Sequence, residues 1–203
     1  LHFAAKTDAA QSAKFEDEFY SNNLEATKNI IKYCDRYNSK LIFASTTSVY
    51  GPQNDLVDEN CDESELNPQS PYAEVKLLEE NIILNHTNFN ENNYLILRMG
   101  TIYGFSMGIR FHTAINKFCF QASVGIPITV WKTAYHQKRP YLGLDDLNAA
   151  IVHVLRNKVI DNQIYNLVSA NSTVKDIVDI INKYVKNVKI EYVDHEIMNQ
   201  LSY

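Results

Sequence analysis

The chain has 203 residues, of which 45% are hydrophobic and 21% are charged, enough for one sizeable core or for one core with a small annex. Nineteen Lys and Arg against 24 Asp and Glu give a net charge of −5 without any basic block, which argues against nucleic acid as a partner. The three cysteines lack CxxC spacing, which argues against a disulfide framework and a cysteine-rich zinc site and indicates a reducing compartment.

The sequence also limits membrane contact and phosphate binding. No apolar run reaches the ~18 residues that span a bilayer, and the first residues lack a basic stretch followed by an apolar one, so we expect a cytoplasmic protein without membrane contact. Glycine occurs six times and never before Gly51, so a Gly-rich phosphate loop near the N-terminus cannot be complete in this chain. Since an initiator Met is also missing, we expect a segment of a longer protein.

Apolar runs and helical periodicity alternate through the first half of the chain. The pattern predicts the end of a strand at 1–5, a helix over 15–37, a buried strand over 41–45, a helix from about Pro71 and a strand over 94–98. The helix from Pro71 is expected to bury a face made of Leu77, Leu78, Ile82 and Ile83. Strands that alternate with helices favour right-handed crossovers and a mostly parallel sheet, so we predict an α/β fold in which this half is the later part of a doubly wound domain.

The pattern loosens after Gly100. It predicts a helix near 111–124, another near 145–155, and strands near 128–131, 139–142, 163–168 and 189–193. Thr173 and Asp176 have the spacing of a capping box, which opens one more helix. Because no Gly/Ser linker separates the halves, we expect them to share an interface.

Tyr72 and Lys76 are the sharpest chemical feature of the sequence. At positions i and i+4 of a helix their side chains lie on one face, so the lysine cation can favour the phenolate and lower the tyrosine pKa from its usual value of about 10. A tyrosine tuned in this way acts as a general base or acid near neutral pH. The alternative interpretation of this spacing is an exposed helical pair without chemistry.

A run of hydroxyl residues follows the buried strand: Ser45, Thr46, Thr47 and Ser48. In an open α/β sheet, ligands bind outside the carboxyl ends of the strands, so these hydroxyls arrive where a substrate would lie. The alternative is a Ser/Thr-rich turn that only caps the strand. The order along the chain, with the hydroxyl run first and the Tyr/Lys helix later, favours the catalytic interpretation.

These landmarks together resemble the extended short-chain dehydrogenase/reductases, specifically the NAD-dependent nucleotide-sugar epimerase/dehydratase group, over nearly the whole chain. The resemblance implies a Rossmann-like doubly wound domain at 1–104, its N-terminal strands missing, and a mainly substrate-binding α/β portion at 105–203 from which some segments return to the first domain. Residues 2–5 resemble the family's fourth strand, and residues 21–24 resemble the helix whose Asn contacts the dinucleotide. The implied NAD contacts are Phe3, Ala4, Ala5, Lys6, Asn22, Ser45, Tyr72, Lys76, Met99 and Gly100.

The resemblance also implies a mechanism. Tyr72 would remove a proton from a sugar hydroxyl while hydride passes to NAD, Lys76 would hold the nicotinamide ribose and lower the Tyr72 pKa, and Thr46 would hydrogen-bond the reacting oxygen. Arg139 lies in a segment similar to the one that meets the nucleotide diphosphate of the sugar, where an arginine makes bidentate contacts. The other implied substrate contacts are Thr47, Ser48, Thr101 and Asn116.

The positions after Thr46 distinguish subclasses of the family. Sugar 4,6-dehydratases carry an Asp-Glu pair there, whereas this chain has Thr47 and Ser48, and two hydroxyls cannot readily replace two carboxyl groups in the removal of water. We therefore expect an enzyme similar to UDP-glucose 4-epimerase, with a 4,6-dehydratase or a keto-sugar reductase as the alternatives. The alternative from another class is a catalytically silent dinucleotide-binding scaffold or sensor.

Partners and metals complete the expectations. Members of the family often dimerise through the helices that carry Asn22 and Tyr72 in this sequence, so we expect a homodimer that binds a nucleotide sugar. The histidines His112, His136 and His153 are scattered without ligand spacing, so we expect no metal site. From the segment alone we expect weak NAD binding and little activity.

Overall fold

The computed structural model describes residues 1–53, 57–89 and 93–194 and divides the chain into two compact units. The first unit comprises Leu1–Met99 and Ala150–Leu167, and the second comprises Gly100–Ala149 and Val168–Tyr203. The chain thus leaves the first unit after Met99 and returns to it at Ala150. The boundary predicted after residue 104 lies slightly further along the chain, and the roles predicted for the two portions stay predictions.

A parallel sheet forms the centre of the first unit. In the described part of the chain its strands have the order β1-β2-β6, with β1 at Leu41–Thr46, β2 at Tyr94–Met99 and β6 at Gln163–Leu167. Thr46 is in register with Met99, so the carboxyl ends of β1 and β2 lie at one edge. His2 forms a parallel bridge to Phe43, which adds the N-terminal residues beside β1. The continuous apolar sequence of β1 and β2 agrees with their burial, since parallel sheets are covered on both faces.

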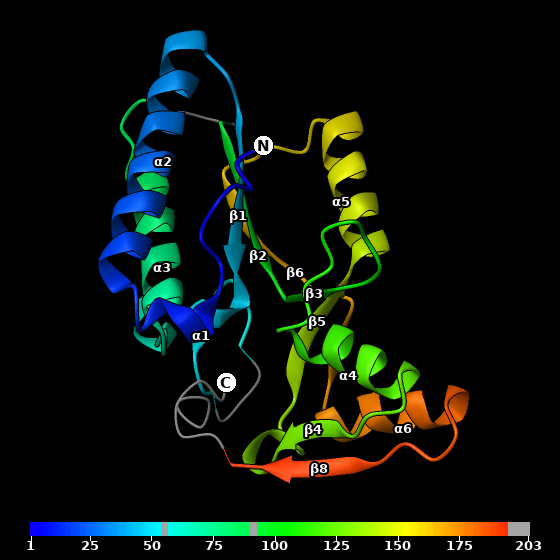
Figure 1. Ribbon diagram of the computed structural model, residues 1–203. Coiled ribbons are helices and arrows are strands. Elements are labelled where there is room, and N and C mark those ends of the chain that lie inside the picture. Colours follow the sequence, from blue (N-terminus) through cyan, green and yellow to red (C-terminus); the bar gives the residue numbers. More distant parts are fainter. Residues whose placement is uncertain (54–56, 90–92, 195–203) are drawn as a thin grey trace. The chain divides into compact units, whose positions relative to one another are not determined.

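Helices cover both faces of this sheet. Figure 1 shows α2 (Glu16–Tyr37) and α3 (Pro71–Leu84) on one side, and α5 (Leu144–Asn157) on the other, of which the part from Ala150 belongs to this unit. The shorter elements are α1 (Ala9–Ser12), η1 (Thr47–Tyr50) and η2 (Glu63–Glu65). A buried apolar cluster joins α2, α3 and the sheet: Ile31, Cys34, Leu41, Phe43, Ile83, Tyr94 and Ile96. The fold is therefore α/β with a parallel sheet, as predicted.

Local sequence sets the start of α3. Ser70 is the N-cap, and its Oγ accepts a hydrogen bond from the Ala73 N–H at 3.2 Å. Pro71 is the first helical residue, where the missing N–H costs nothing because no intrahelical partner exists for it. The cap therefore fixes Tyr72 in the first turn of the helix.

The second unit contains two small sheets and two helices. β3 (Thr101–Tyr103) runs parallel to β5 (Arg139–Gly143), and β7 (Ala170–Ser172) pairs with β5 in antiparallel fashion. β4 (Ile128–Trp131) pairs in parallel with β8 (Ile190–Val193), and η3 covers Lys132–Ala134. α4 (Ala114–Ser123) and α6 (Val174–Tyr184) contact each other.

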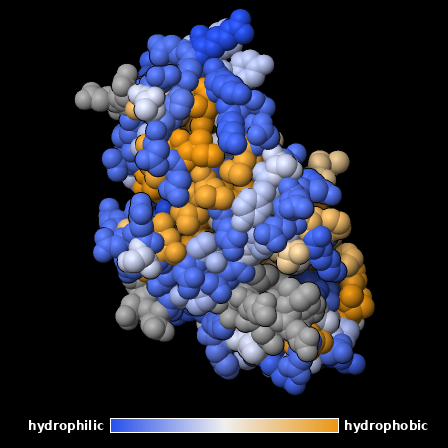
Figure 2. Space-filling model, turned by 90° about the vertical axis from the view of Figure 1, so that its left-hand side faces the viewer, coloured by the Kyte–Doolittle hydropathy of each residue, from blue (hydrophilic) through white to orange (hydrophobic). Residues whose placement is uncertain are grey.

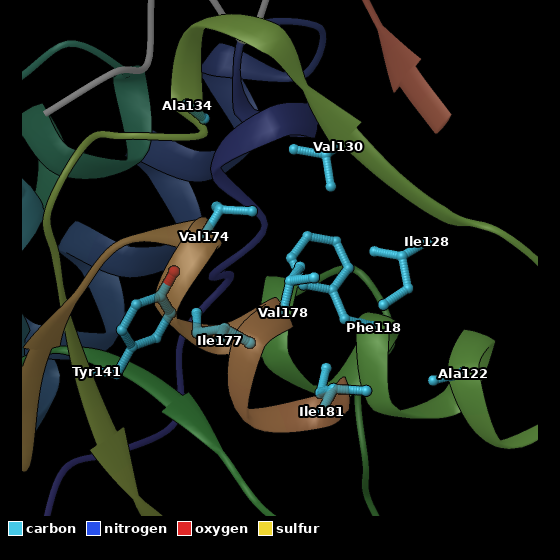
Figure 3. Packing of buried hydrophobic residues seen from close by; sticks show 10 residues of the cluster. All are labelled: Phe118, Ala122, Ile128, Val130, Ala134, Tyr141, Val174, Ile177, Val178 and Ile181. Carbon is cyan, nitrogen blue, oxygen red and sulfur yellow. The ribbon is translucent and has the colours of Figure 1, made fainter. Parts of the chain in front are cut away.

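The core of the second unit lies between these elements. Figure 3 shows side chains of α4, α6, β4 and β5 pointing toward one another. The buried members are Phe118, Ala122, Ile128, Val130, Ala134, Tyr141, Val174, Ile177, Val178 and Ile181. α6 begins at the predicted capping box, in which Thr173 Oγ1 accepts from the Asp176 N–H at 3.0 Å and the Asp176 carboxylate accepts from the Thr173 N–H at 2.9 Å.

The predicted helices, and the predicted strands from Leu41 onward, are confirmed in type and approximate extent, with α4 shorter than the predicted helix at 111–124. Of the strand end predicted at 1–5, only the single bridge at His2 forms. The apolar face predicted for α3 is wrong in part, because Leu78 is 42% exposed whereas Lys76, Glu79 and Glu80 are buried. The physical reason is that α3 contacts both α2 and β1, so two of its sides are covered. The short elements α1, β3 and β7 were not predicted, since three or four residues show no periodicity.

Candidate active site

The hydroxyl run leaves β1 at the carboxyl edge of the sheet. Thr46 is buried, and its Oγ1 accepts a hydrogen bond from the Ser48 N–H at 3.2 Å, which opens η1. Thr47 Oγ1 donates to the carbonyl of Met99, the last residue of β2, at 3.3 Å. The run thus caps the strand and also presents side chains at the edge where parallel sheets bind ligands.

α3 contacts η1, which brings the second half of the candidate site to the hydroxyl run. Tyr72 is partly buried in the first turn of α3. Lys76 lies one turn later and is only 3% exposed. Thr46, Tyr72 and Lys76 therefore belong to one unit and to two elements in contact.

Lys76 points into the interior of the first unit. Its Nζ lies 3.1 Å from Glu79 Oε2 and 4.5 Å from the centroid of the Phe43 ring. Burial lowers the pKa of the Lys76 ammonium, and the carboxylates of Glu79 and Glu80 act in the opposite direction. The cation is thus held between a carboxylate and an aromatic face.

The Glu79 carboxylate is itself tied to two other segments. Its Oε1 accepts a hydrogen bond from the Thr27 hydroxyl of α2, and Thr27 Oγ1 lies 3.0 Å from His2 Nε2. A threonine hydroxyl has one proton, so Thr27 accepts from His2, whose Nε2 carries the hydrogen. Burial and then the Lys76 charge lower the pKa of His2, which agrees with a neutral ring.

The neighbouring carboxylate of Glu80 has different partners. It accepts a hydrogen bond from Ser45 Oγ, and hydrogen bonds from Arg98 Nη2 at 2.7 Å and Nε at 3.1 Å. The Arg98 guanidinium lies 4.9 Å from the centroid of the Tyr50 ring, and the Tyr50 hydroxyl donates to Asn166 Oδ1 at 2.8 Å. Ser45, implied above as an NAD contact, is therefore hydrogen-bonded within the interior.

The segment implied to run along NAD follows the bridge at His2. Phe3 and Ala4 are exposed, and Ala5 and Lys6 are partly buried. The side chain of Asn23 on α2 holds this segment: Oδ1 accepts from the Lys6 N–H at 2.9 Å and Nδ2 donates to the Lys6 carbonyl at 3.0 Å. The path of the backbone after Ala5 is thus fixed by a side chain of α2.

Asn22 and Asn23 differ sharply in environment. Asn22, the residue implied as a dinucleotide contact, is exposed, whereas Asn23 is fully buried. Sequence reasoning missed Asn23, although it lies four residues after the buried Phe19 and four before Thr27, on the same helical stripe. No comparable signal marks Glu79 and Glu80, because buried carboxylates are rare and a sequence pattern assigns them to the surface.

The remaining predicted residues belong to the second unit and are described within it. Gly100 is buried, and a Cβ there would lie 3.0 Å from the Pro140 carbonyl oxygen. Thr101 begins β3 and is in register with Tyr141 of β5, and Arg139, partly buried, begins β5. Burial raises the pKa of Tyr141, and the Arg139 charge lowers it, so this cation acts near the buried phenol.

Asn116 has a structural task in the second unit. Its Oδ1 accepts from the Gly104 N–H at 3.0 Å, and its Nδ2 donates to the Arg110 carbonyl at 3.2 Å. These two hydrogen bonds connect α4 to the loop after β3. Any contact to substrate would therefore compete with the bonds that shape this loop.

Among the residues that the structure describes, no group of three or more His, Cys, Asp or Glu side chains is arranged to hold a metal ion. The helices in the same residues all lack the combination of length and apolar character that crossing a bilayer requires.

Comparisons with known proteins give a consistent relationship. The sequence profile of the NAD dependent epimerase/dehydratase family matches residues 1–167. A UDP-glucose 4-epimerase of Caenorhabditis elegans is 33% identical over 100 residues, which are 48% of this chain and 29% of that protein. A dTDP-D-glucose 4,6-dehydratase of Dictyostelium discoideum is 29% identical over 179 residues, which are 82% of this chain and 40% of that protein. Each match therefore covers less than half the length of the relative.

Solved structures show the same relationship. The UDP-glucuronic acid 4-epimerase of Bacillus cereus, solved in complex with UDP-glucuronic acid and NAD, is 26% identical with a TM-score of 0.83. The alignment covers 96% of this chain and 62% of that one. Epimerases and a dehydratase are thus both among the similar proteins.

Proposed function

Because the chain belongs to the NAD dependent epimerase/dehydratase family, as its motifs predict, we propose that the whole protein is an NAD-dependent epimerase of a nucleotide-activated sugar, similar to UDP-glucose 4-epimerase. One observation carries the proposal: α3, with Tyr72 and Lys76, contacts the hydroxyl run at the carboxyl end of β1. We also propose that the first unit is the later part of a Rossmann-like doubly wound domain, since helices cover both faces of its parallel sheet.

The residues present fit a bound NAD at this edge. Phe3 and Ala4, which follow the bridge at His2, are exposed, and the Asn23 side chain holds the backbone of Lys6 further along this segment. The family resemblance implies that an asparagine of α2 helps to bind the dinucleotide. We propose that this residue is Asn23 in place of Asn22, and that it acts by holding the Lys6 backbone in position. The chemistry that NAD supplies when bound is reversible acceptance of hydride from the sugar.

The chain's own residues would handle the proton. Tyr72 takes the proton of the sugar hydroxyl as general base and returns it after the keto-sugar has turned. Thr46 Oγ1 already accepts from the Ser48 N–H, which leaves its own proton to bond the reacting oxygen. Lys76 supplies the positive charge that favours the Tyr72 phenolate, and within the described residues Glu79 is the sole ion-pair partner of its ammonium.

The hydroxyls after Thr46 favour epimerisation over dehydration. Removal of water needs an acid and a base, and Thr47 already donates its proton to the Met99 carbonyl. Ser48 carries no charge at neutral pH. A 4,6-dehydratase and a keto-sugar reductase are therefore the outcomes that the test below must separate from an epimerase.

The second unit would bind the nucleotide sugar. We propose that Arg139 contacts the diphosphate, because a guanidinium fork binds two phosphate oxygens at once. Thr101 and Asn116 of this unit, and Thr47 and Ser48 of the first unit, are the other proposed contacts. Asn116 supports this role least, since it already bonds Gly104 and Arg110.

The test is turnover of a panel of UDP-, dTDP- and GDP-sugars by the full-length protein with NAD. We expect one or more sugars to be converted to their epimers, and Tyr72→Phe to abolish conversion. A dehydrated or reduced product would assign the enzyme to one of the alternative subclasses. No conversion of any sugar with NAD bound would support the silent scaffold instead, and full activity of Tyr72→Phe would overturn the proposed base.

We further propose that the protein forms a homodimer through α2 and α3. Figure 2 shows an apolar strip between hydrophilic residues on the face where these helices lie. On α3, Leu78 is 42% exposed and Leu84 is 40% exposed, so large aliphatic side chains contribute to this face. Contiguous exposed apolar surface of this kind marks interaction sites.

A further inference from the structure

Glu79 is a buried acid with an unusual position next to a proposed catalytic group. Its side chain is fully buried, and the Lys76 ammonium, itself almost fully buried, lies 3.1 Å from its Oε2. We propose that Glu79 is a positioning residue that holds the Lys76 ammonium, charged and in one place, for the chemistry of Tyr72. This inference rests on the proposed function for the role of Tyr72, but the ion pair itself is independent of it.

The Glu79 carboxylate is also held in place by a hydrogen bond that does not involve the lysine. Oε1 accepts from the Thr27 hydroxyl, and Thr27 in turn accepts from His2. Oε2 has no hydrogen-bond partner among the described residues, so its charge is matched by the nearby ammonium alone. An ionised carboxylate in such a place is costly unless a cation faces it. Glu79 and Lys76 therefore depend on each other.

The other groups that face Lys76 cannot replace Glu79. Glu80, on the same helix, already accepts bonds from Arg98 and Ser45. The N-terminal segment contributes His2, which is neutral, and β1 contributes the Phe43 ring, which attracts a cation more weakly than a carboxylate does. α2 contributes Thr27, which does not titrate in the accessible range. Loss of the Glu79 charge would leave the buried ammonium beside the Phe43 ring and with only the more distant influence of Glu80, which is already paired with Arg98.

A titration of Lys76 tests the proposal without any turnover. The Lys76 side-chain NMR signal of the isotope-labelled chain, assigned by its loss in Lys76→Met, is followed from neutral to alkaline pH. In the unsubstituted chain we expect Lys76 to stay charged at neutral pH. In Glu79→Gln we expect the midpoint to fall by about one pH unit or more, since an adjacent opposite charge shifts a pKa by about 1 to 3.

Glu74→Gln is the matched control, because it removes the same charge from α3 at a carboxylate that bonds Tyr20. We expect it to leave the Lys76 midpoint unchanged. The same midpoint in Glu79→Gln as in the unsubstituted chain would overturn the proposal. If Glu79→Gln does not fold, a neutral Lys76 at neutral pH in the unsubstituted chain would overturn it equally.

Turnover separates this inference from the proposed function. In the full-length enzyme, Glu79→Gln should move the alkaline limb of the pH profile to lower pH, and Glu79→Asp should restore it toward its original place. A purely structural role would lower activity without moving the limb, and that result would contradict the inference. If no sugar is turned over but the titrations behave as expected, the proposed function fails and the hold of Glu79 on Lys76 stands.

Discussion

Glu79 and Glu80 are neighbours in α3, yet each neutralises a different cation. Glu79 faces Lys76, and Glu80 faces Arg98, with all four side chains nearly or fully buried. Pairing of this kind is required because a single buried charge would cost several kcal/mol. Each carboxylate also accepts one hydroxyl bond, from Thr27 and from Ser45 respectively. The pairs thus link α3 to α2 and to β1 and β2 through specific bonds.

Removing the Glu80 charge tests how much this pairing contributes. We expect Glu80→Gln to lower the free energy of unfolding by about 3 to 5 kcal/mol, because Arg98 would stay buried without a counter-charge. Urea unfolding followed by circular dichroism measures the loss. Asp179→Asn, which breaks the exposed pair with Lys175, is the matched control and should cost about 0.5 kcal/mol or less. Equal losses in the two variants would contradict the buried pair's role.

His2 makes the first unit sensitive to acid. Burial and the Lys76 charge lower its folded pKa, whereas in the unfolded chain it titrates at about 6.5. The unfolded chain therefore binds a proton first, and stability is lost as the pH falls below about 6.5. When the pH is lowered through this range, we expect the urea midpoint of unfolding to fall more for the unsubstituted chain than for His2→Gln. The glutamine keeps a hydrogen-bond donor for Thr27 but does not titrate. An identical fall in both would refute this assignment.

At the scale of elements, α3 carries most of the candidate site on one short helix. Its N-cap at Ser70 sets the first turn, where Tyr72 lies, and its next two turns bury Lys76, Glu79 and Glu80. The helix thus contributes a proposed base, a cation and the two carboxylates that pair with Lys76 and Arg98. Its position depends on where it begins, because a shift of one residue would rotate all four side chains by about 100°.

The cap at Ser70 can be tested directly. We expect Ser70→Ala to lower the free energy of unfolding by about 1 kcal/mol, since the Ala73 N–H loses its acceptor. Ser70→Thr keeps the hydroxyl and should lose much less. Ser21→Ala on the exposed side of α2 serves as the control, with an expected change near zero. Thermal or urea unfolding followed by circular dichroism measures these changes. Equal losses of stability in Ser70→Ala and Ser21→Ala would contradict the role of the cap.

The elements also show what a sequence can predict. Periodicity identified α2, β1, β2 and α6, because each is long and has one or two covered faces. It missed β3 and β7, which have three residues each. These strands form because they pair with β5, which is distant from them in the sequence. It predicted that Tyr72 and Lys76 lie on one helix, but it did not predict that Lys76 is buried. The reason is that Glu79, the carboxylate that stabilises the buried ammonium, has the sequence pattern of a surface residue.

At the scale of the whole molecule, the chain crosses between its two units three times, the last time after Leu167. It leaves the first unit after Met99, at the carboxyl end of β2, and returns within α5 at Ala150 to supply β6. β6 pairs with β2, so the sheet of the first unit needs a strand that follows most of the second unit in sequence. A truncation after residue 104 would therefore remove β6 and expose the β2 edge.

The apolar face of α2 and α3 gives the last prediction. If it is a dimer interface, a charge in its centre costs binding because an unpaired carboxylate would be desolvated. We expect the unsubstituted chain to sediment as a dimer and Leu78→Glu to sediment as a monomer. Ile180→Glu places the same charge on α6 at a side chain that is 51% exposed, and should leave the dimer intact. Sedimentation velocity distinguishes these results; an unsubstituted monomer, or an unchanged dimer in Leu78→Glu, would rule out this interface.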